Sequence, residues 1–120
     1  MNFDEAVLAH SKWKMRLLEV AMGLSKESLD PEIVGADNKC ALGQWIHGEA
    51  KQKYSQLSEY LTLIEVHASF HQCASSVLRM ALSGQAEEAK IHLNTGGSFM
   101  GASTQTITAI RRLQRKVGNL

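Results

Sequence analysis

Apolar residues recur at steps of three and four near the start of the chain, which predicts an amphipathic helix over about residues 2–24. One face of this helix carries Phe3, Val7, His10, Trp13, Leu17, Val20, Ala21 and Leu24. His10 lies in the middle of that apolar stripe. Considered alone, it is better explained as a core or half-buried histidine than as a ligand, so the other elements must decide its role.

The same period continues for six turns in a second long segment, which predicts a helix from about Ser55 to Ser83. Its apolar face carries Tyr60, Leu63, Ile64, His67, Phe70, His71, Ala74, Val77, Leu78 and Ala81. A third stripe predicts a final helix that begins at Ser98, a residue suited to an N-cap, and ends near Gly118. We therefore expect an all-α four-helix bundle with short additional helices, formed as a single domain by residues 1–120.

The shorter helices are expected in the connections between the long ones. Pro31 after Asp30 suits a first helical position behind a cap, in a segment that otherwise looks like a connection. A compact segment runs from Cys40 to Gly48, where glycine marks its end. Gly43 in this segment leaves room for the close approach of a neighbouring helix.

Composition limits the functions that this chain can have. With 44% hydrophobic residues and a single proline in 120 residues, the chain favours helices over a turn-rich β fold. A net charge of +1 is not typical of a surface for nucleic acid or anionic membranes. No apolar stretch approaches the roughly 18 residues of a membrane span. We expect a cytoplasmic protein without a nucleic-acid partner or membrane insertion, whose two cysteines form no disulfide.

His67 and His71 are the central chemical feature of the sequence. Residues four apart share one helix face, so both imidazoles can converge on a single metal ion. Buried imidazoles need partners, and no acidic residue stands between these two. A shared metal is the simplest partner, and separate hydrogen bonds to backbone or water are the alternative.

Two further residues can complete a tetrahedral site. They are His10 and Cys40, which opens the tight segment Cys40-Ala-Leu-Gly-Gln-Trp45. Three histidines and one cysteine fill the four positions that zinc prefers, so we predict one zinc ion per chain in the bundle core, held by His10, Cys40, His67 and His71. A closed site has no open position to activate water, and we expect no enzymatic activity.

Competing metal sites fail on spacing. A zincin needs glutamate after the first histidine of the pair, but Ala68 stands there, and no acidic residue precedes any histidine by three positions as a di-iron bundle requires. Cys73 is expected in the core and His47 at the surface or in a cap. His92 is expected to pair with Glu88 one turn earlier.

Together, His10 with Trp13, Cys40-x-Leu42-Gly43-x-Trp45 and His67-x-x-x-His71 form a pattern that resembles the chemoreceptor zinc-binding (CZB) domain of bacterial signalling proteins. The resemblance implies that the same four residues hold zinc. It also implies a regulatory role in chemotaxis or cyclic-di-GMP signalling, exerted through a CZB dimer on a chemoreceptor or diguanylate cyclase output domain. No output domain is recognisable here, so the chain is either free-standing or a piece of a larger protein.

Three functions follow from these expectations. The leading one is a regulatory domain that responds to zinc. The alternatives are a sensor of oxidants such as hypochlorous acid, acting through the zinc-bound Cys40, and a structural zinc module for dimerisation. The expected partners are a second copy of the chain and a signalling protein or covalently linked output domain. Leu57, Leu61 or the final helix could supply the dimer surface, and periodicity does not choose among them.

Overall fold

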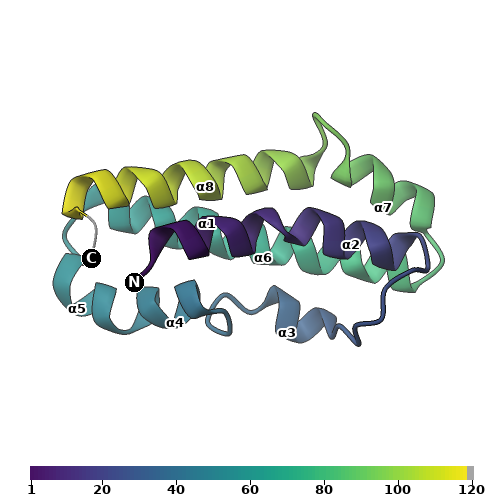
Figure 1. Cartoon of the computed structure of the whole chain (residues 1–120), viewed down its shortest axis with the longest axis horizontal. Coiled ribbons are helices and arrows are strands. Elements are labelled where there is room, and N and C mark those ends of the chain that lie inside the picture. The colour runs from purple at the N-terminus through teal and green to yellow at the C-terminus, as the bar shows by residue number, and fades with distance from the viewer. Residues whose placement is uncertain (119–120) are drawn as a thin grey trace.

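Helices supply all the regular secondary structure of residues 1–118, which are the residues that the computed structural model describes (Figure 1). This confirms the predicted all-α class. The helices are α1 (Phe3–Ser11), α2 (Trp13–Ala21), α3 (Pro31–Gly35), α4 (Ala41–His47), α5 (Glu49–Tyr54), α6 (Ser58–Leu82), α7 (Ala86–Leu93) and α8 (Ser98–Val117).

The helices lie in rows around α6, the longest of them. Figure 1 shows α1 and α2 end to end as one row, α7 and α8 as a second, and α3, α4 and α5 as a third. Helix α6 packs against α2, α3, α7 and α8, and α1 packs against α8. Helix α6 therefore contacts all three rows, and the first and second rows also pack directly on each other through α1 with α8 and α2 with α7.

The first helix differs from the prediction, because it is interrupted at Lys12 and ends at Ala21. Two side chains just before the interruption bind carbonyl groups one turn back. The His10 ring donates from Nδ1 to the Ala6 carbonyl at 2.7 Å, and the Ser11 hydroxyl donates to the Val7 carbonyl at 2.8 Å. Such bonds compete with the backbone ladder and bend helices, which explains a break beside His10.

The other boundaries shift by a few residues. Helix α6 begins at Ser58 rather than Ser55, and the short helix α5 lies before it. Helix α8 is capped by Gly97, so Ser98 is its first residue and not its N-cap. Asp30 caps α3 as predicted, accepting from the Glu32 amide at 2.9 Å. Within the described chain, no helix is both long and apolar enough to cross a membrane.

Two hydrophobic clusters fill the interior. The first includes Phe3, Trp45, Ile46, Leu63 and Leu113. The second includes Leu17, Phe70, Leu78, Leu93 and Phe99. On α6, His67 lies between Leu63 of the first cluster and Phe70 of the second, and His71 follows Phe70. On the first row, His10 lies between Ala6 of the first cluster and Leu17 of the second. Three buried histidines thus lie where the two apolar clusters meet.

Candidate metal centre

Helix α6 presents His67 and His71 to the interior, one turn apart. Their side chains are almost completely buried, with exposed fractions of 0% and 3%. The two Nε2 atoms are 3.0 Å apart. The spacing in sequence therefore brings two nitrogen donors to one point, as the helical period requires.

His10 approaches the same point from α1. Its ring centre lies 5.1 Å from that of His67 and 5.7 Å from that of His71. Because its Nδ1 is bonded to the Ala6 carbonyl, its Nε2 is the nitrogen left for another partner. This Nε2 is buried and has no hydrogen-bond partner among the described residues. A buried polar atom without a partner is costly, so this atom points to a ligand.

Cys40 completes the cluster from the start of α4. Its Sγ lies 3.3 Å from Nε2 of His67 and 3.6 Å from Nε2 of His71. Cys40 is the N-cap of α4, and its sulfur accepts a hydrogen bond from the Gly43 amide at 3.3 Å. That bond fixes the side chain toward the histidines and favours a thiolate.

Gly43 has a different neighbour from the one expected. A Cβ at this position would overlap the backbone carbonyl of Asp37 and crowd Cα of Asn38 at 3.1 Å. The close approach is therefore made by the loop before Cys40 and not by a helix. Glycine lets that loop fold tightly over the first turn of α4, which sets the position of Cys40.

The four donor atoms lie close enough together to hold one metal ion. One ligand atom from each of His10, Cys40, His67 and His71 lies within 4.8 Å of all the others. With Zn–N of about 2.05 Å and Zn–S of about 2.3 Å, tetrahedral edges measure roughly 3.3 Å between nitrogens and roughly 3.6 Å between sulfur and nitrogen. The edges among Cys40, His67 and His71, at 3.0, 3.3 and 3.6 Å, are close to these values. The residues present fit one zinc ion.

Two of the histidines are oriented by backbone carbonyls. Nδ1 of His71 donates to the Val34 carbonyl at 2.8 Å, and Nδ1 of His10 donates to the Ala6 carbonyl at 2.7 Å. Ligating histidines commonly donate their second nitrogen in this way, which fixes the tautomer and the ring. Nδ1 of His67 is buried without a partner among the described residues. Sequence reasoning missed these carbonyls, because a backbone group carries no sequence signature.

Burial keeps the three imidazoles in the form that binds metals. It lowers the pKa of His67 from 6.5 to about 2, with smaller contributions from the neighbouring histidines. Burial is also the main reason why the pKa values of His10 and His71 are lowered. Neutral rings offer a lone pair at physiological pH. Burial raises the pKa of the Cys40 thiol, so this group must lose a proton when it binds a metal.

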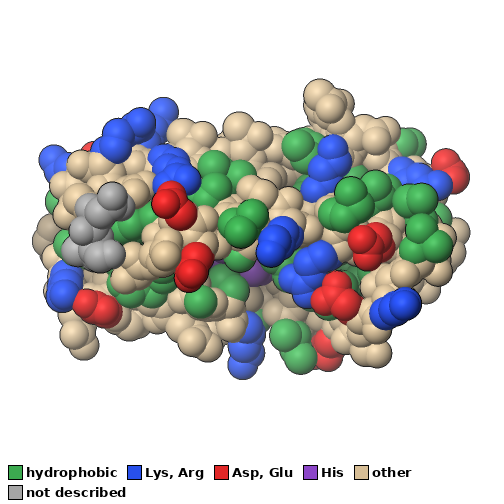
Figure 2. Space-filling model, viewed as in Figure 1, with side chains coloured by type: hydrophobic (Ala, Val, Ile, Leu, Met, Phe, Trp, Pro, Cys, Tyr) green, Lys and Arg blue, Asp and Glu red, His purple; other side chains and the backbone are tan. Residues whose placement is uncertain are grey.

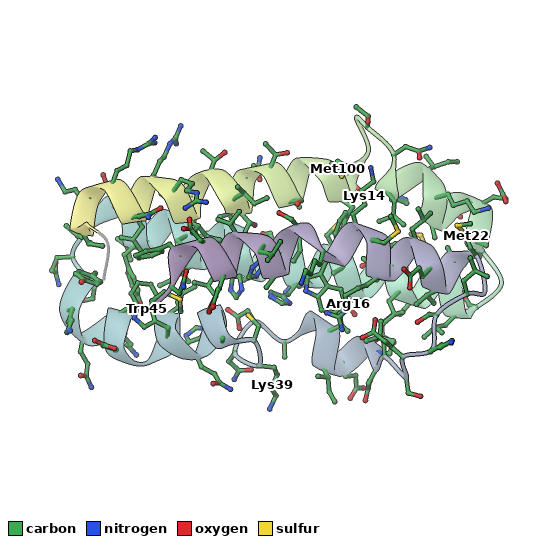
Figure 3. All side chains as sticks on the ribbon, viewed as in Figure 1. Lys14, Arg16, Met22, Lys39, Trp45 and Met100 are labelled. Atoms are coloured by element: carbon green, nitrogen blue, oxygen red, sulfur yellow. The ribbon has the colours of Figure 1, made fainter. Side chains whose placement is uncertain are left out.

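Cys40 is the most accessible residue of the cluster. The residue is half-buried, whereas the three histidines are buried. Cys40 lines three surface pockets. One is also lined by Trp13 and Arg16, the second by His10 and the third by Leu8. Figure 2 shows histidine surface at the floor of a hollow beneath the α1–α2 row, and Figure 3 shows Arg16 and Lys39 on the two sides of this gap.

The remaining candidates lie outside the cluster. His47 is partly exposed and pairs with Asp37 at 3.1 Å, consistent with a surface residue. The predicted pairing of His92 with Glu88 is wrong, since His92 bonds the Ser98 hydroxyl at 2.7 Å. Cys73 is half-buried, with its sulfur 3.9 Å from the Ser98 hydroxyl, and is less enclosed than a core cysteine.

The fold and the site define a helical protein with three buried histidines and one half-buried cysteine that could hold a metal ion. A comparison with protein-family models matches the chemoreceptor zinc-binding domain over residues 10–78. The match covers more than half of the chain and includes all four residues of the cluster, and the chain belongs to this family. Comparisons with curated proteins and with solved structures find no match.

Proposed function

We propose that this chain is a zinc-responsive regulatory domain that holds one zinc ion through His10, Cys40, His67 and His71. Membership in the chemoreceptor zinc-binding family supports a zinc-binding domain of signalling proteins. The finer proposal is control of chemotaxis or cyclic-di-GMP output in the bacterial cytoplasm. The output would be a covalently linked domain or a separate signalling protein, and the domain itself would not act as an enzyme.

The observation that carries the proposal is the origin of the four donors. His10 comes from α1, Cys40 from the start of α4, and the other two from α6. The pockets beside Cys40 separate the α1–α2 row from the α3–α4 segment, so side-chain packing between these rows is limited there. When bound, zinc would supply four strong bonds that join the three elements. The metal centre would therefore cross-link α1, the Cys40 segment and α6.

The metal-free cluster offers a reason for a conformational response. Nε2 of His10 would stay buried without a partner, at a cost of about 1–3 kcal/mol. The close Nε2 atoms of His67 and His71 can share only one hydrogen between them when both rings are neutral. Hydration of these atoms would require α1 or the Cys40 segment to move outward. Such a movement would be limited, because Phe3 of α1 and Leu42 of α4 are anchored in the first hydrophobic cluster.

Metal content tests the proposal directly. Inductively coupled plasma mass spectrometry of the purified protein should find about one zinc per chain, largely lost in Cys40→Ser and kept in the matched control Cys73→Ser. Circular dichroism should show that Cys40→Ser keeps most of its helix content. A folded wild-type protein that neither contains zinc nor takes it up would contradict the proposal.

Oxidant sensing is the second candidate, favoured by the access to Cys40 from three surface pockets. With hypochlorous acid, the thiolate sulfur forms an S–O bond and loses two electrons, while the O–Cl bond breaks and chloride leaves. The resulting sulfenic acid is a poorer zinc ligand than the thiolate. Mass spectrometry after mild treatment should then find oxygen on Cys40 together with released zinc.

Two other results would decide against oxidant sensing. Modification confined to Cys73 would show that the zinc-bound sulfur is protected. Zinc that resists both oxidant and a strong chelator would instead identify a structural metal, as in a zinc module for dimerisation.

A further inference from the structure

The position of the hydrogen on each buried histidine ring follows from the partners of its two nitrogens. A neutral imidazole carries one hydrogen, on Nδ1 or on Nε2. Nδ1 of His10 lies 2.7 Å from the Ala6 carbonyl. Nδ1 of His71 lies 2.8 Å from the Val34 carbonyl. Because a carbonyl oxygen only accepts, both rings carry their hydrogen on Nδ1 and keep a lone pair on Nε2, which is the form that binds a metal.

The ring of His67 has different partners. Its Nε2 lies 3.0 Å from Nε2 of His71 and 3.3 Å from Sγ of Cys40. With no metal bound, Nε2 of His71 has no hydrogen to give, and two facing lone pairs at 3.0 Å would repel each other. The hydrogen in this contact therefore belongs to His67, which donates it from Nε2 to His71. Nδ1 of His67 is buried without a partner among the described residues, so no acceptor draws the hydrogen to that side.

The thiol of Cys40 does not change this assignment. Its sulfur lies 3.3 Å from Nε2 of His67 and 3.6 Å from Nε2 of His71. An S–H group is a weak donor, and a bond from it to either ring would leave the two Nε2 lone pairs facing each other. The sulfur already accepts from the Gly43 amide and can accept a second hydrogen from His67.

We propose that His67 is a tautomeric switch, with its hydrogen on Nε2 in the metal-free protein and on Nδ1 in the zinc-bound protein. The rings of His10 and His71 keep their hydrogen on Nδ1 in both states. At His67 the Nε2–H bond breaks and that proton passes to solvent, while a proton from solvent forms the Nδ1–H bond. The ring stays neutral throughout. The inference rests on the zinc site proposed above and identifies the ligand that must rearrange before the metal binds.

The switch places zinc in competition with a hydrogen bond inside the site. Zinc binding removes the bond from His67 to His71 and leaves the Nδ1 hydrogen of His67 buried without an acceptor. Both changes lower zinc affinity, whereas His10 and His71 already have the tautomer that the metal needs. The rearrangement of His67 therefore sets how readily the site takes up zinc.

Nitrogen-15 NMR of the full chain with labelled histidines tests the switch, because protonated and bare ring nitrogens resonate at well-separated frequencies. The variants His47→Gln and His92→Gln identify the signals of the two rings outside the cluster. Among the three remaining rings, the protein stripped of metal by a chelator should show one with hydrogen on Nε2 and two with hydrogen on Nδ1. After one equivalent of zinc, all three should carry it on Nδ1.

Two variants of the cluster assign the ring that switches. In the metal-free protein, His67→Gln should remove the Nε2–H signal, and the matched His10→Gln should keep it because the pair on α6 is intact. Three rings with hydrogen on Nδ1 before zinc is added would overturn the proposal, as would loss of the Nε2–H signal in folded His10→Gln. A chain that takes up no zinc would contradict the function proposed above, while its metal-free spectrum would still decide the tautomer of His67.

Discussion

At the scale of single residues, the metal centre depends on small features around the donors. The rings of His10 and His71 are held by backbone carbonyls, and the sulfur of Cys40 is held by the Gly43 amide. These bonds leave one donor atom on each side chain free to face the common centre. Preorganised donors need little rearrangement to bind a metal, which favours affinity.

Gly43→Ala should reduce zinc affinity by about tenfold or more, because the new Cβ would push the Asp37–Asn38 backbone away and displace Cys40. Competition with a zinc chelator measures the effect. The matched control is Gly101→Ala, another helical glycine, where a Cβ meets nothing within 4 Å. This change should keep zinc affinity and raise the free energy of unfolding by about 0.5–1 kcal/mol. Equal zinc affinities for the two variants would refute the role given to Gly43.

At the scale of elements, the short helix α3 connects the metal centre to α6. The Ser75 hydroxyl of α6 donates to the Pro31 carbonyl at 2.7 Å, and Nδ1 of His71 donates to the Val34 carbonyl at 2.8 Å. Gly35 lies close to the same serine, since a Cβ there would be 3.1 Å from Ser75 Cβ. A five-residue helix is not stable alone, so these contacts hold the segment that leads to Cys40.

Ser75→Ala should lower the free energy of unfolding by about 1 kcal/mol, because the Pro31 carbonyl loses its bond from α6. It should also speed amide hydrogen exchange in residues 31–40 and weaken zinc binding. Ser76→Ala, one residue on and exposed, is the control and should change neither property. Unchanged exchange in residues 31–40 of Ser75→Ala would mean that α3 is held by other contacts.

At the scale of the whole molecule, three neutral histidines lie where the two hydrophobic clusters meet. The clusters can keep the helices assembled when the metal is removed. The three histidines then have no metal bond that competes with a proton. The unfolded chain binds a proton on each histidine below a pKa of about 6.5, whereas burial lowers the pKa values of the folded chain. Acid therefore favours unfolding.

The metal-free protein should lose stability as the pH falls from 7 to 5. Between the folded and unfolded pKa values the unfolded state holds more protons, so the free energy of unfolding falls by up to about 1.4 kcal/mol per pH unit for each histidine. Urea unfolding at several pH values measures the slope. His67→Gln should reduce it, and the outlying His92→Gln should leave it unchanged. A free energy of unfolding that does not vary over this range would show that the cluster is hydrated.

The sequence by itself determined the helical class and the four candidate ligands. Periodicity depends only on local geometry, so it placed His67 and His71 on one face of α6 and located the long helices to within a few residues. The residue types in the cluster predicted a closed zinc site. The sequence did not predict the break after His10 or the bond between His92 and Ser98. Both depend on side-chain hydrogen bonds, which hydrophobic periodicity does not reveal.

Only the tertiary structure decided what surrounds those residues. The distance from His10 to the pair on α6 and the Val34 carbonyl behind His71 both join residues far apart in sequence, and the loop that closes over Gly43 has no periodic pattern. Periodicity likewise separates an apolar face from a polar one but does not say which apolar residues stay exposed. Burial of Leu17 and exposure of Met15 on the same helix depend on where α6, α7 and α8 lie around it.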